Sequence, residues 1–180
     1  MFDLDRFVED CRAAVTSDPT HKSAAELLKR AMADPAAVTA AVGEPTSGGI
    51  IPIHQADDLT ILNVIWKPGM TLMPHNHNMW AVIGVYGGRE DNIFWRRIKD
   101  APNGEIEAAG AEALSTGDVA PLGPDIIHSV TNPIPRLTGA IHVYGGDFFA
   151  QHRSEWDPEH LTERPYDVER ARAAFASTGR

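Results

Sequence analysis

The sequence has few cysteines, few basic residues and no long apolar run. Cys11 is the single cysteine among 180 residues, which excludes an intramolecular disulfide and suits the reducing cytoplasm where we expect the protein to work. The 16 Lys and Arg residues are outnumbered by 25 Asp and Glu residues, giving a net charge of −9. We therefore expect no binding to nucleic acid or to an anionic membrane, because phosphate contacts need a basic surface. No run approaches the ~20 apolar residues of a membrane span, and the acidic N-terminal segment is not expected to be a signal peptide.

Two common enzyme signatures are also missing. There is no G-x-S-x-G motif, which argues against hydrolysis by a serine nucleophile. The glycines between residues 43 and 49 lack the lysine and the spacing of a phosphate-binding loop. What the sequence does have is eight histidines and four tryptophans.

The composition changes about a quarter of the way along the chain. The first part is rich in alanine, and its apolar residues recur at helical spacing over 2–16. Asp-Pro pairs at 18–19 and 34–35 predict the starts of two further helices, the second of which should stop at Gly43. We therefore expect residues 1–45 to form a helical extension that packs on the rest of the protein.

From residue 46 to residue 153 the sequence is typical of β structure. Short runs rich in Val, Ile, Trp and Tyr alternate with Gly or Pro, and pairs at 87–88 and 103–104 are expected to form hairpin turns. Many short antiparallel strands indicate a sandwich or barrel, of which a jelly roll is one form. Residues 154–180 should form a polar tail with a helix over 167–177. The expected strands are 50–54, 59–66, 80–86, 91–98, 105–109, 118–121, 127–131 and 137–144.

Histidines in the β region suggest a metal site. His75 and His77 form an H-x-H pair, and residues two apart on a strand point to the same face. Two imidazoles held in this way can place nitrogens at about 2.0–2.1 Å from one ion. The alternative is a pair of polar side chains on a solvated face. His128 lies in an otherwise apolar strand, where it is either a hydrogen-bonded core residue or a third ligand, since a buried imidazole needs a partner.

Two segments resemble the sequence motifs of the cupin superfamily. Residues 69–77 read G-x5-H-x-H and residues 117–132 read G-x10-H-x3-N. The resemblance implies a mainly β protein, a double-stranded β-helix (the cupin jelly-roll barrel), here with N-terminal helices and a short C-terminal helix. It also implies that the metal ligands are His75, His77 and His128.

The absence of a glutamate ligand narrows the resemblance to one group within the superfamily. The first cupin motif usually carries a glutamate four or five residues after its second histidine, and here Ala81 and Val82 occupy those positions. A cupin with three histidines and no glutamate is similar to the cysteine dioxygenase group of thiol dioxygenases. The stretch H-x-H-x-x-W followed by Gly-Gly-Arg-Glu, over 75–90, is similar to bacterial 3-mercaptopropionate dioxygenases.

The same resemblance implies further site residues. The segment around His142 and Tyr144 matches the H-x-Y strand that lies beside the iron in thiol dioxygenases, and we expect these two residues to be catalytic. Arg153 lies where the mercaptopropionate branch keeps its carboxylate-binding arginine, and Trp80 is expected to line the substrate pocket. Tyr144 could instead be a structural interior residue, and Arg153 could instead pair at the surface with Glu155 or Asp157.

Three departures from the family bear on the substrate. The serine that usually precedes the H-x-Y histidine by two residues is Ala140 here, so a Ser-His-Tyr relay is shortened. No Arg lies between residues 31 and 88, and neither Ala81 nor Val82 can form the Cys–Tyr crosslink of animal enzymes. Cysteine is therefore a less favoured substrate than a mercaptopropionate-like thiol.

The ligand set also favours a particular chemistry. Three neutral imidazoles leave a divalent ion its full charge and several open positions, which suits an anionic thiolate and dioxygen. Fe²⁺ is expected because oxygen activation needs a redox metal, although another divalent transition metal is compatible with the ligands. We expect oxidation of a small thiol to a sulfinate by a monomer or small homo-oligomer whose partners are the substrate and O₂. The alternatives are a cupin dioxygenase for a non-thiol substrate such as a β-diketone, and a metal-binding cupin without catalysis.

Overall fold

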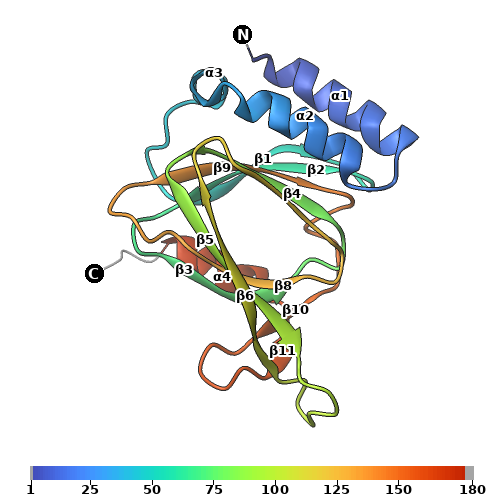
Figure 1. The fold of residues 1–180 in the computed structure, drawn as a ribbon, viewed down its shortest axis with the longest axis vertical. Coiled ribbons are helices and arrows are strands. Elements are labelled where there is room, and N and C mark those ends of the chain that lie inside the picture. The colour runs from blue at the N-terminus through green and yellow to red at the C-terminus, as the bar shows by residue number, and fades with distance from the viewer. Residues whose placement is uncertain (1, 177–180) are drawn as a thin grey trace.

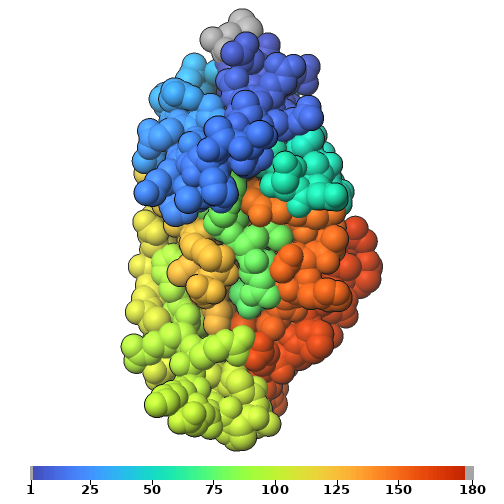
Figure 2. Space-filling model, turned by 90° about the vertical axis from the view of Figure 1, so that its right-hand side faces the viewer, coloured from blue at the N-terminus to red at the C-terminus, as the bar shows by residue number. Residues whose placement is uncertain are grey.

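The helices of the N-terminal segment cover the outer face of a β-sheet. The structure, a computed structural model, describes residues 2–176. Helices α1 (Leu4–Ser17), α2 (Lys22–Met32) and α3 (Pro35–Val42) pack on one another, and α2 and α3 contact strand β4 (Ala81–Gly87) (Figure 1). Figure 2 shows these helices at one end of an elongated molecule. No helix within residues 2–176 is long and apolar enough to cross a membrane.

Helix α3 starts and ends at the residues that the sequence predicts. The Asp34 carboxylate accepts a hydrogen bond from the backbone N–H of Ala37, at 3.1 Å, and so caps the first turn. The helix stops at Gly43, whose positive φ of 88° suits a residue without a side chain. Helix α1 also matches the prediction to within a residue or two at each end.

The prediction for α2 is wrong at its start. The helix begins at Lys22, and its N-cap residue, His21, makes no side-chain cap bond. Asp18 accepts hydrogen bonds from the backbone and hydroxyl of Thr20, at 2.9 and 2.7 Å, and from the hydroxyl and backbone N–H of Ser23, at 2.9 and 3.3 Å. The carboxylate thus closes a turn before the helix and satisfies one N–H of its first turn, but it does so from four residues before Lys22 and not from the N-cap position.

The β region forms two facing antiparallel sheets within residues 2–176. In the first sheet the strand order is β1-β2-β9-β4-β7, and in the second it is β11-β10-β3-β8-β5-β6. The remaining strands of the first sheet are β1 (Gly49–Gln55), β2 (Thr60–Trp66), β7 (Val119–Leu122) and β9 (Thr138–Tyr144). Those of the second are β3 (Thr71–Asn76), β5 (Arg89–Arg97), β6 (Ile106–Ser115), β8 (Ile127–Thr131), β10 (Ser154–Trp156) and β11 (Glu163–Pro165).

The pairing of the strands is nested. Strand β5 pairs with β6, β4 with β7, β3 with β8 and β2 with β9, all antiparallel. Starting from the β5–β6 turn, a two-stranded ribbon therefore passes alternately into the two sheets. This is the topology of a double-stranded β-helix, or jelly roll, and it confirms the predicted fold class.

Both expected hairpin turns can be checked against this topology. Residues 103–104 do connect the paired strands β5 and β6, and Gly104 has a positive φ of 66°. Residues 87–88 do not form a hairpin, because β4 and β5 lie in different sheets. Gly88 has a φ of 95°, and a Cβ atom there would lie 2.9 Å from Cα of Thr138, so the close approach requires glycine.

The C-terminal segment is part of the barrel. Strand β10 pairs with β3, which extends the second sheet beyond the expected boundary at residue 153. Helix α4 (Val168–Ala176) contacts both β1 and β3, which belong to different sheets, and so closes the space between them. The expected last residue of this helix, Ser177, lies outside the described residues.

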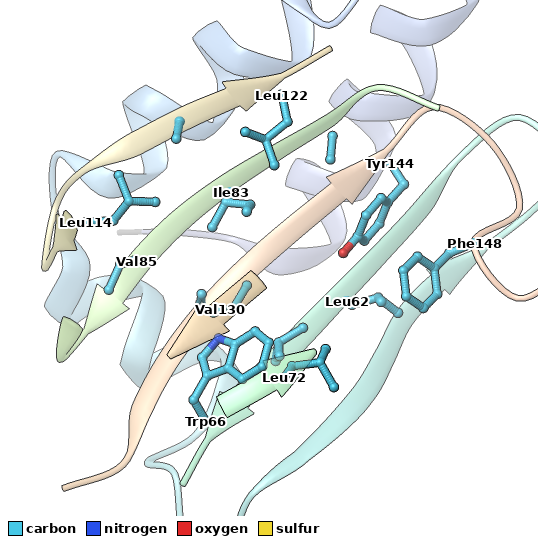
Figure 3. Packing of buried hydrophobic residues seen from close by; sticks show 14 of the residues in the cluster. Leu62, Trp66, Leu72, Ile83, Val85, Leu114, Leu122, Val130, Tyr144 and Phe148 are labelled. Carbon is cyan, nitrogen blue, oxygen red and sulfur yellow. The ribbon is translucent and has the colours of Figure 1, made fainter. Parts of the chain in front are cut away.

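The main core lies between the two sheets. Figure 3 shows Leu62 and Trp66 of β2, Ile83 and Val85 of β4, and other apolar side chains in this space. A second cluster of buried residues lies between the helices and the first sheet, and includes Val82. Successive residues of β4 thus alternate between the barrel interior and the helix-covered face, as expected for a strand buried on both sides.

Candidate metal centre

The three predicted ligands meet inside the barrel. His75 is the last residue but one of β3, His77 follows the strand directly, and His128 lies on β8 opposite His75 in the β3·β8 ladder. All three are buried, and one nitrogen of each lies within 4.8 Å of those of the other two. The ring centroids are 4.7 to 5.1 Å apart. This triad can hold a metal ion, because imidazole nitrogens at this spacing can converge on one centre.

Hydrogen bonds orient the histidine rings. Nδ1 of His75 lies 2.9 Å from the carbonyl oxygen of Met73, and Nδ1 of His128 lies 2.7 Å from Oδ1 of Asn92. Both oxygens accept, so each Nδ1 carries the proton and each Nε2 is left free. Nε2 of His128 faces Nε2 of His77 at 3.4 Å. This is the arrangement by which proteins fix metal-binding imidazoles.

The triad is electrically neutral near pH 7. Burial lowers the pKa of His75 to about 4 and lowers the pKa values of His77 and His128 well below their usual range. The positive charge of Arg153 lowers all three further. Neutral imidazole is the form that binds metal. Within the described residues the cluster includes no carboxylate.

The His142–Tyr144 pair lies beside the triad. The two side chains share one face of β9, and Nδ1 of His142 is 3.0 Å from the hydroxyl of Tyr144. The Tyr144 ring is 5.1 Å from that of His77, and its hydroxyl points into the barrel (Figure 3). Burial raises the pKa of Tyr144, so the phenol keeps its proton at neutral pH.

Arg153 is buried close to the triad and has no counter-ion among residues 2–176. It is only 9% exposed, and its guanidinium lies between the rings of Phe148 and Tyr166, 3.9 Å from each centroid. Its Nη1 atom is buried and has no hydrogen-bond partner among residues 2–176. The alternative of a surface pair with Glu155 or Asp157 is therefore wrong. Those carboxylates pair with other arginines instead.

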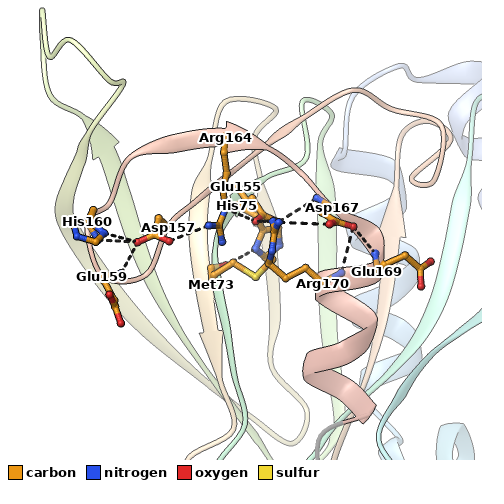
Figure 4. Close-up of polar contacts among 10 residues, drawn as sticks. All are labelled: Met73, His75, Glu155, Asp157, Glu159, His160, Arg164, Asp167, Glu169 and Arg170. Atoms are coloured by element: carbon orange, nitrogen blue, oxygen red, sulfur yellow. Dashed lines mark hydrogen bonds and ion pairs between the residues drawn. The ribbon is translucent and has the colours of Figure 1, made fainter.

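Glu155 ties the C-terminal segment to the strand of the first ligand. This carboxylate is fully buried and lies opposite His75 in the β10·β3 pair. It accepts hydrogen bonds from Nε of Arg164 at 2.7 Å, from the backbone N–H of Asp167 at 3.1 Å, and from Arg170 (Figure 4). The chain leading into α4 is thus held against the metal centre.

A small cavity of about 20 Å³ lies among the three histidines and their neighbours. That volume suffices for about one water-sized group. Outside it, a surface groove of about 910 Å³ is lined in part by Arg153 and Tyr166, and Tyr166 borders both spaces. Besides the triad, the cavity is lined by residues that include Trp66, His142, Tyr144, Phe148, Tyr166 and Phe175.

Sequence reasoning missed part of this lining. Tyr166 and Phe175 come from a tail that was expected to be polar, yet Tyr166, just before α4, and Phe175, on α4, both line the cavity. The ring of Phe175 lies 5.2 Å from that of Trp66. The available signal was the occurrence of aromatic residues at 166 and 175 in an otherwise polar stretch.

Trp80, which was expected to line the substrate pocket, does not join the site. Its Nε1–H donates to the carbonyl of Pro19 at 2.9 Å, and its ring packs with the helix-side cluster. The reason is strand alternation, because Trp80 shares its face with Val82, while Ala81 faces the interior. Asn132 holds a turn by donating to the carbonyls of Trp66 and Arg136.

Comparison with known proteins supports the fold. No model of a known protein family matches the sequence. A structure of a Bacillus halodurans protein matches with a TM-score of 0.50 and 14% identity, over 71% of this chain and 85% of that one. A cupin of the RmlC-like family from Methanocaldococcus jannaschii matches with a TM-score of 0.47 and 8% identity, over 59% and 86%. A Klebsiella pneumoniae protein with a double-stranded β-helix domain matches with a TM-score of 0.42 and 16% identity, over 69% and 90%. At these identities the similarity concerns the fold alone. The chain is thus a protein with a double-stranded β-helix fold and a histidine triad that can hold a metal.

Proposed function

We propose that this protein is a non-haem iron dioxygenase that uses O₂ to oxidise a small thiol bearing a carboxylate, similar to 3-mercaptopropionate or cysteine, to a sulfinate. One observation carries the proposal: a neutral three-histidine cluster lines a small cavity, and the guanidinium of Arg153, buried without a counter-ion among residues 2–176, stacks on two rings of the wall of that cavity. His75, His77 and His128 would hold the ion. A ferrous ion bound there would bring thiolate and O₂ together and supply the redox chemistry.

The proposed reaction balances without a further reductant. Both atoms of O₂ are added to the sulfur of R–SH, which gives the sulfinate R–SO₂⁻ and one proton. The sulfur loses four electrons and the oxygen molecule gains four. The thiol proton is released when the sulfur binds as a thiolate and is returned to solvent. No second substrate or organic cofactor is therefore required.

Arg153 supports a substrate with a carboxylate. A guanidinium keeps its charge at any physiological pH, and burying an ion without a partner costs several kcal/mol. The stacked rings of Phe148 and Tyr166 hold the guanidinium plane in place, while Nη1 remains without an acceptor. A substrate carboxylate would supply that acceptor and neutralise the charge. The two rings that stack on Arg153 also adjoin the triad, because Tyr166 lies 6.0 Å from the ring of His75 and Phe148 lies 6.2 Å from that of His77. The thiol and carboxylate of the substrate should therefore be joined by a short chain.

Tyr144 would assist at the reacting sulfur. Its hydroxyl points into the cavity and is bonded to Nδ1 of His142. Because burial keeps the phenol protonated, it can donate a hydrogen bond to a bound anion or pass a proton to His142. The cavity holds about one water-sized group, so a substrate can enter only if the Tyr166 side of the wall moves outward.

The function is tested by metal analysis followed by oxygen consumption. The purified protein should contain iron, and the ferrous protein should consume O₂ with 3-mercaptopropionate and form one sulfinate per O₂. Acetylacetone serves as the matched non-thiol substrate. Oxygen uptake with acetylacetone alone would replace the proposal with diketone cleavage. Stoichiometric metal without oxygen uptake across a panel of thiols would indicate a metal-binding protein without this catalysis.

A further inference from the structure

Glu90 is a fully buried carboxylate without a strong cation beside it. It lies on β5 with 0% exposure. Oε2 accepts a hydrogen bond from Nε1–H of Trp66 at 2.8 Å, and Oε1 accepts one from the side-chain amide of Asn92 at 3.1 Å. Within the described part of the chain its one ion-pair partner is His142. A buried carboxylate is costly unless several donors surround it, so this one must have a use or a further donor.

His142 supplies that donor. Nε2 of His142 is buried, has no hydrogen-bond partner among residues 2–176, and lies 3.6 Å from Oε2 of Glu90. A bridging water would hold the two atoms roughly 4.5 Å apart or more, so none fits between them. The two groups can therefore satisfy each other only directly, by closing less than 1 Å to the ~2.8 Å of a charge-assisted hydrogen bond. The other ring nitrogen of His142 already faces Tyr144.

We propose that Glu90 is a positioning residue that keeps a proton on Nε2 of His142 and thereby leaves Nδ1 to exchange the hydroxyl proton of Tyr144. The carboxylate of Glu90, the imidazole of His142 and the phenol of Tyr144 then form one chain of hydrogen-bonding groups that leads to the cavity. A buried carboxylate orients a catalytic histidine in the same manner in serine proteases, where it fixes the tautomer. The sequence predicts a shortened relay because Ala140 replaces a serine; the far nitrogen of His142 instead faces Glu90.

The same carboxylate acts on the metal site through Asn92. Because Glu90 accepts from the amide nitrogen of Asn92, the amide oxygen must point the other way, toward Nδ1 of His128 at 2.7 Å. His128 is thereby held with its Nε2 free for the metal. Glu90 and Asn92 are two residues apart on β5 and so share the inward face. One carboxylate thus sets the tautomers of a metal ligand and of the histidine behind Tyr144.

Glu90→Gln provides a sharp test, because an amide has one acceptor and one donor end. If its oxygen faces Trp66 and His142, its NH₂ meets the NH₂ of Asn92. If its NH₂ faces His142, Nε1–H of Trp66 loses its acceptor, and the His142 ring must accept at Nε2 and carry its proton on Nδ1. With Zn²⁺ on the triad, His128 is fixed by the metal and Asn92 with it, which disfavours the first orientation, so we expect His142 to be the ring that changes.

The tautomers are measured by two-bond ¹H–¹⁵N correlation spectra of ¹⁵N-histidine-labelled protein, zinc-loaded and metal-free, with the His142 signals identified from His142→Asn. We expect Nε2–H for His142 in the unmodified protein and a switch to Nδ1–H in zinc-loaded Glu90→Gln. Glu155→Gln, the same change at another fully buried carboxylate, should leave His142 unchanged. If Nε2 of His142 carries no proton in the unmodified protein, the inference is overturned, and this result can be obtained even where the Glu90 variant does not fold.

The catalytic consequence rests on the proposed function and is measured separately. With iron and 3-mercaptopropionate, Glu90→Gln should lower kcat by about 10- to 100-fold and change KM by less than about threefold. If the unmodified protein consumes no O₂ with thiols, the proposed function fails and the tautomer result still stands. If that protein is active while Glu90→Gln keeps both its kcat and the His142 tautomer, the role of Glu90 is overturned and the function stands.

Discussion

The side-chain oxygen of Asn92 lies 2.7 Å from Nδ1 of His128, and both residues are buried. This contact holds the ring in the tautomer that binds metal through Nε2. Asn92→Ala should therefore lower metal affinity by about 10- to 100-fold without removing a ligand. Affinity is measured by competition with a chromophoric chelator. Asn103→Ala, in the exposed β5–β6 turn, is the control, and an unchanged affinity in Asn92→Ala would contradict this role.

Removing a metal ligand should weaken metal binding more than removing Asn92, which only orients a ligand. His128→Ala leaves two imidazoles and a gap in the triad, so the purified variant should lose stoichiometric metal. His54→Ala is the matched control, because His54 lies on β1 and is not part of the cluster. Metal content is read by inductively coupled plasma spectrometry. Full metal retention in His128→Ala would show that this ligand is wrongly assigned.

The metal-free protein should become less stable as the pH falls from about 6.5 toward 4. In the unfolded chain histidines bind protons near their ordinary pKa, whereas burial lowers the pKa of folded His75 to about 4 and those of His77 and His128 well below normal. As the pH falls, the histidines of the unfolded chain therefore bind protons, while the buried histidines of the folded protein stay neutral. Each buried histidine contributes up to about 1.4 kcal/mol of lost stability per pH unit in this window. Urea denaturation at pH 7, 6 and 5 measures the slope, and equal stability at pH 7 and 5 would contradict the prediction.

Arg153→Met should weaken substrate binding without lowering the free energy of unfolding. The variant keeps an apolar stem between Phe148 and Tyr166 but removes a buried charge that has no counter-ion. Its free energy of unfolding should be equal to or above that of the unmodified protein. The KM for 3-mercaptopropionate should rise at least about tenfold, while that for cysteamine, which has no carboxylate, should change by less than about threefold. Equal effects on both thiols would remove Arg153 from substrate binding.

Glu155→Gln should loosen the C-terminal wall of the cavity. The carboxylate accepts from Arg164, Arg170 and the backbone of Asp167, and its neutral analogue should lower the free energy of unfolding by about 1–3 kcal/mol. Amide hydrogen exchange over 166–176 should accelerate. Glu169→Gln, which breaks an exposed i,i+3 pair, should change stability by less than about 0.5 kcal/mol. Unchanged exchange over 166–176 in Glu155→Gln would show that another contact holds the segment.

Local signals predict much of the fold. The Asp34 cap and Gly43 stop define α3, and most strands occur where apolar runs indicate them. Strand β3 is less visible because Pro74 and the polar residues after it interrupt the apolar pattern. The turn at 87–88 is misjudged because a Gly-Gly pair allows a sharp bend but does not say which sheet the next strand joins.

The candidate site, too, has one part that the sequence predicts and another part that it does not. The H-x-H spacing and the single histidine in an apolar strand identify the triad, because His75 and His128 lie opposite each other on paired strands and His77 follows directly after the first of them. Glu90, Tyr166 and Phe175 could not be placed from sequence, since each reaches the site only through the packing of distant segments. The environment of Arg153 likewise depends on β10 and β11 carrying Tyr166 back over it.

The nested ribbon also constrains when the centre can form during synthesis. His77 and His128 are 51 residues apart and meet only once β3 has paired with β8. A nascent chain that has emerged from the ribosome only as far as β7 carries the H-x-H pair but not the third ligand. Chelation by all three histidines must therefore wait until residues beyond Thr131 have left the exit tunnel, so the barrel is largely assembled before the triad can capture a metal ion.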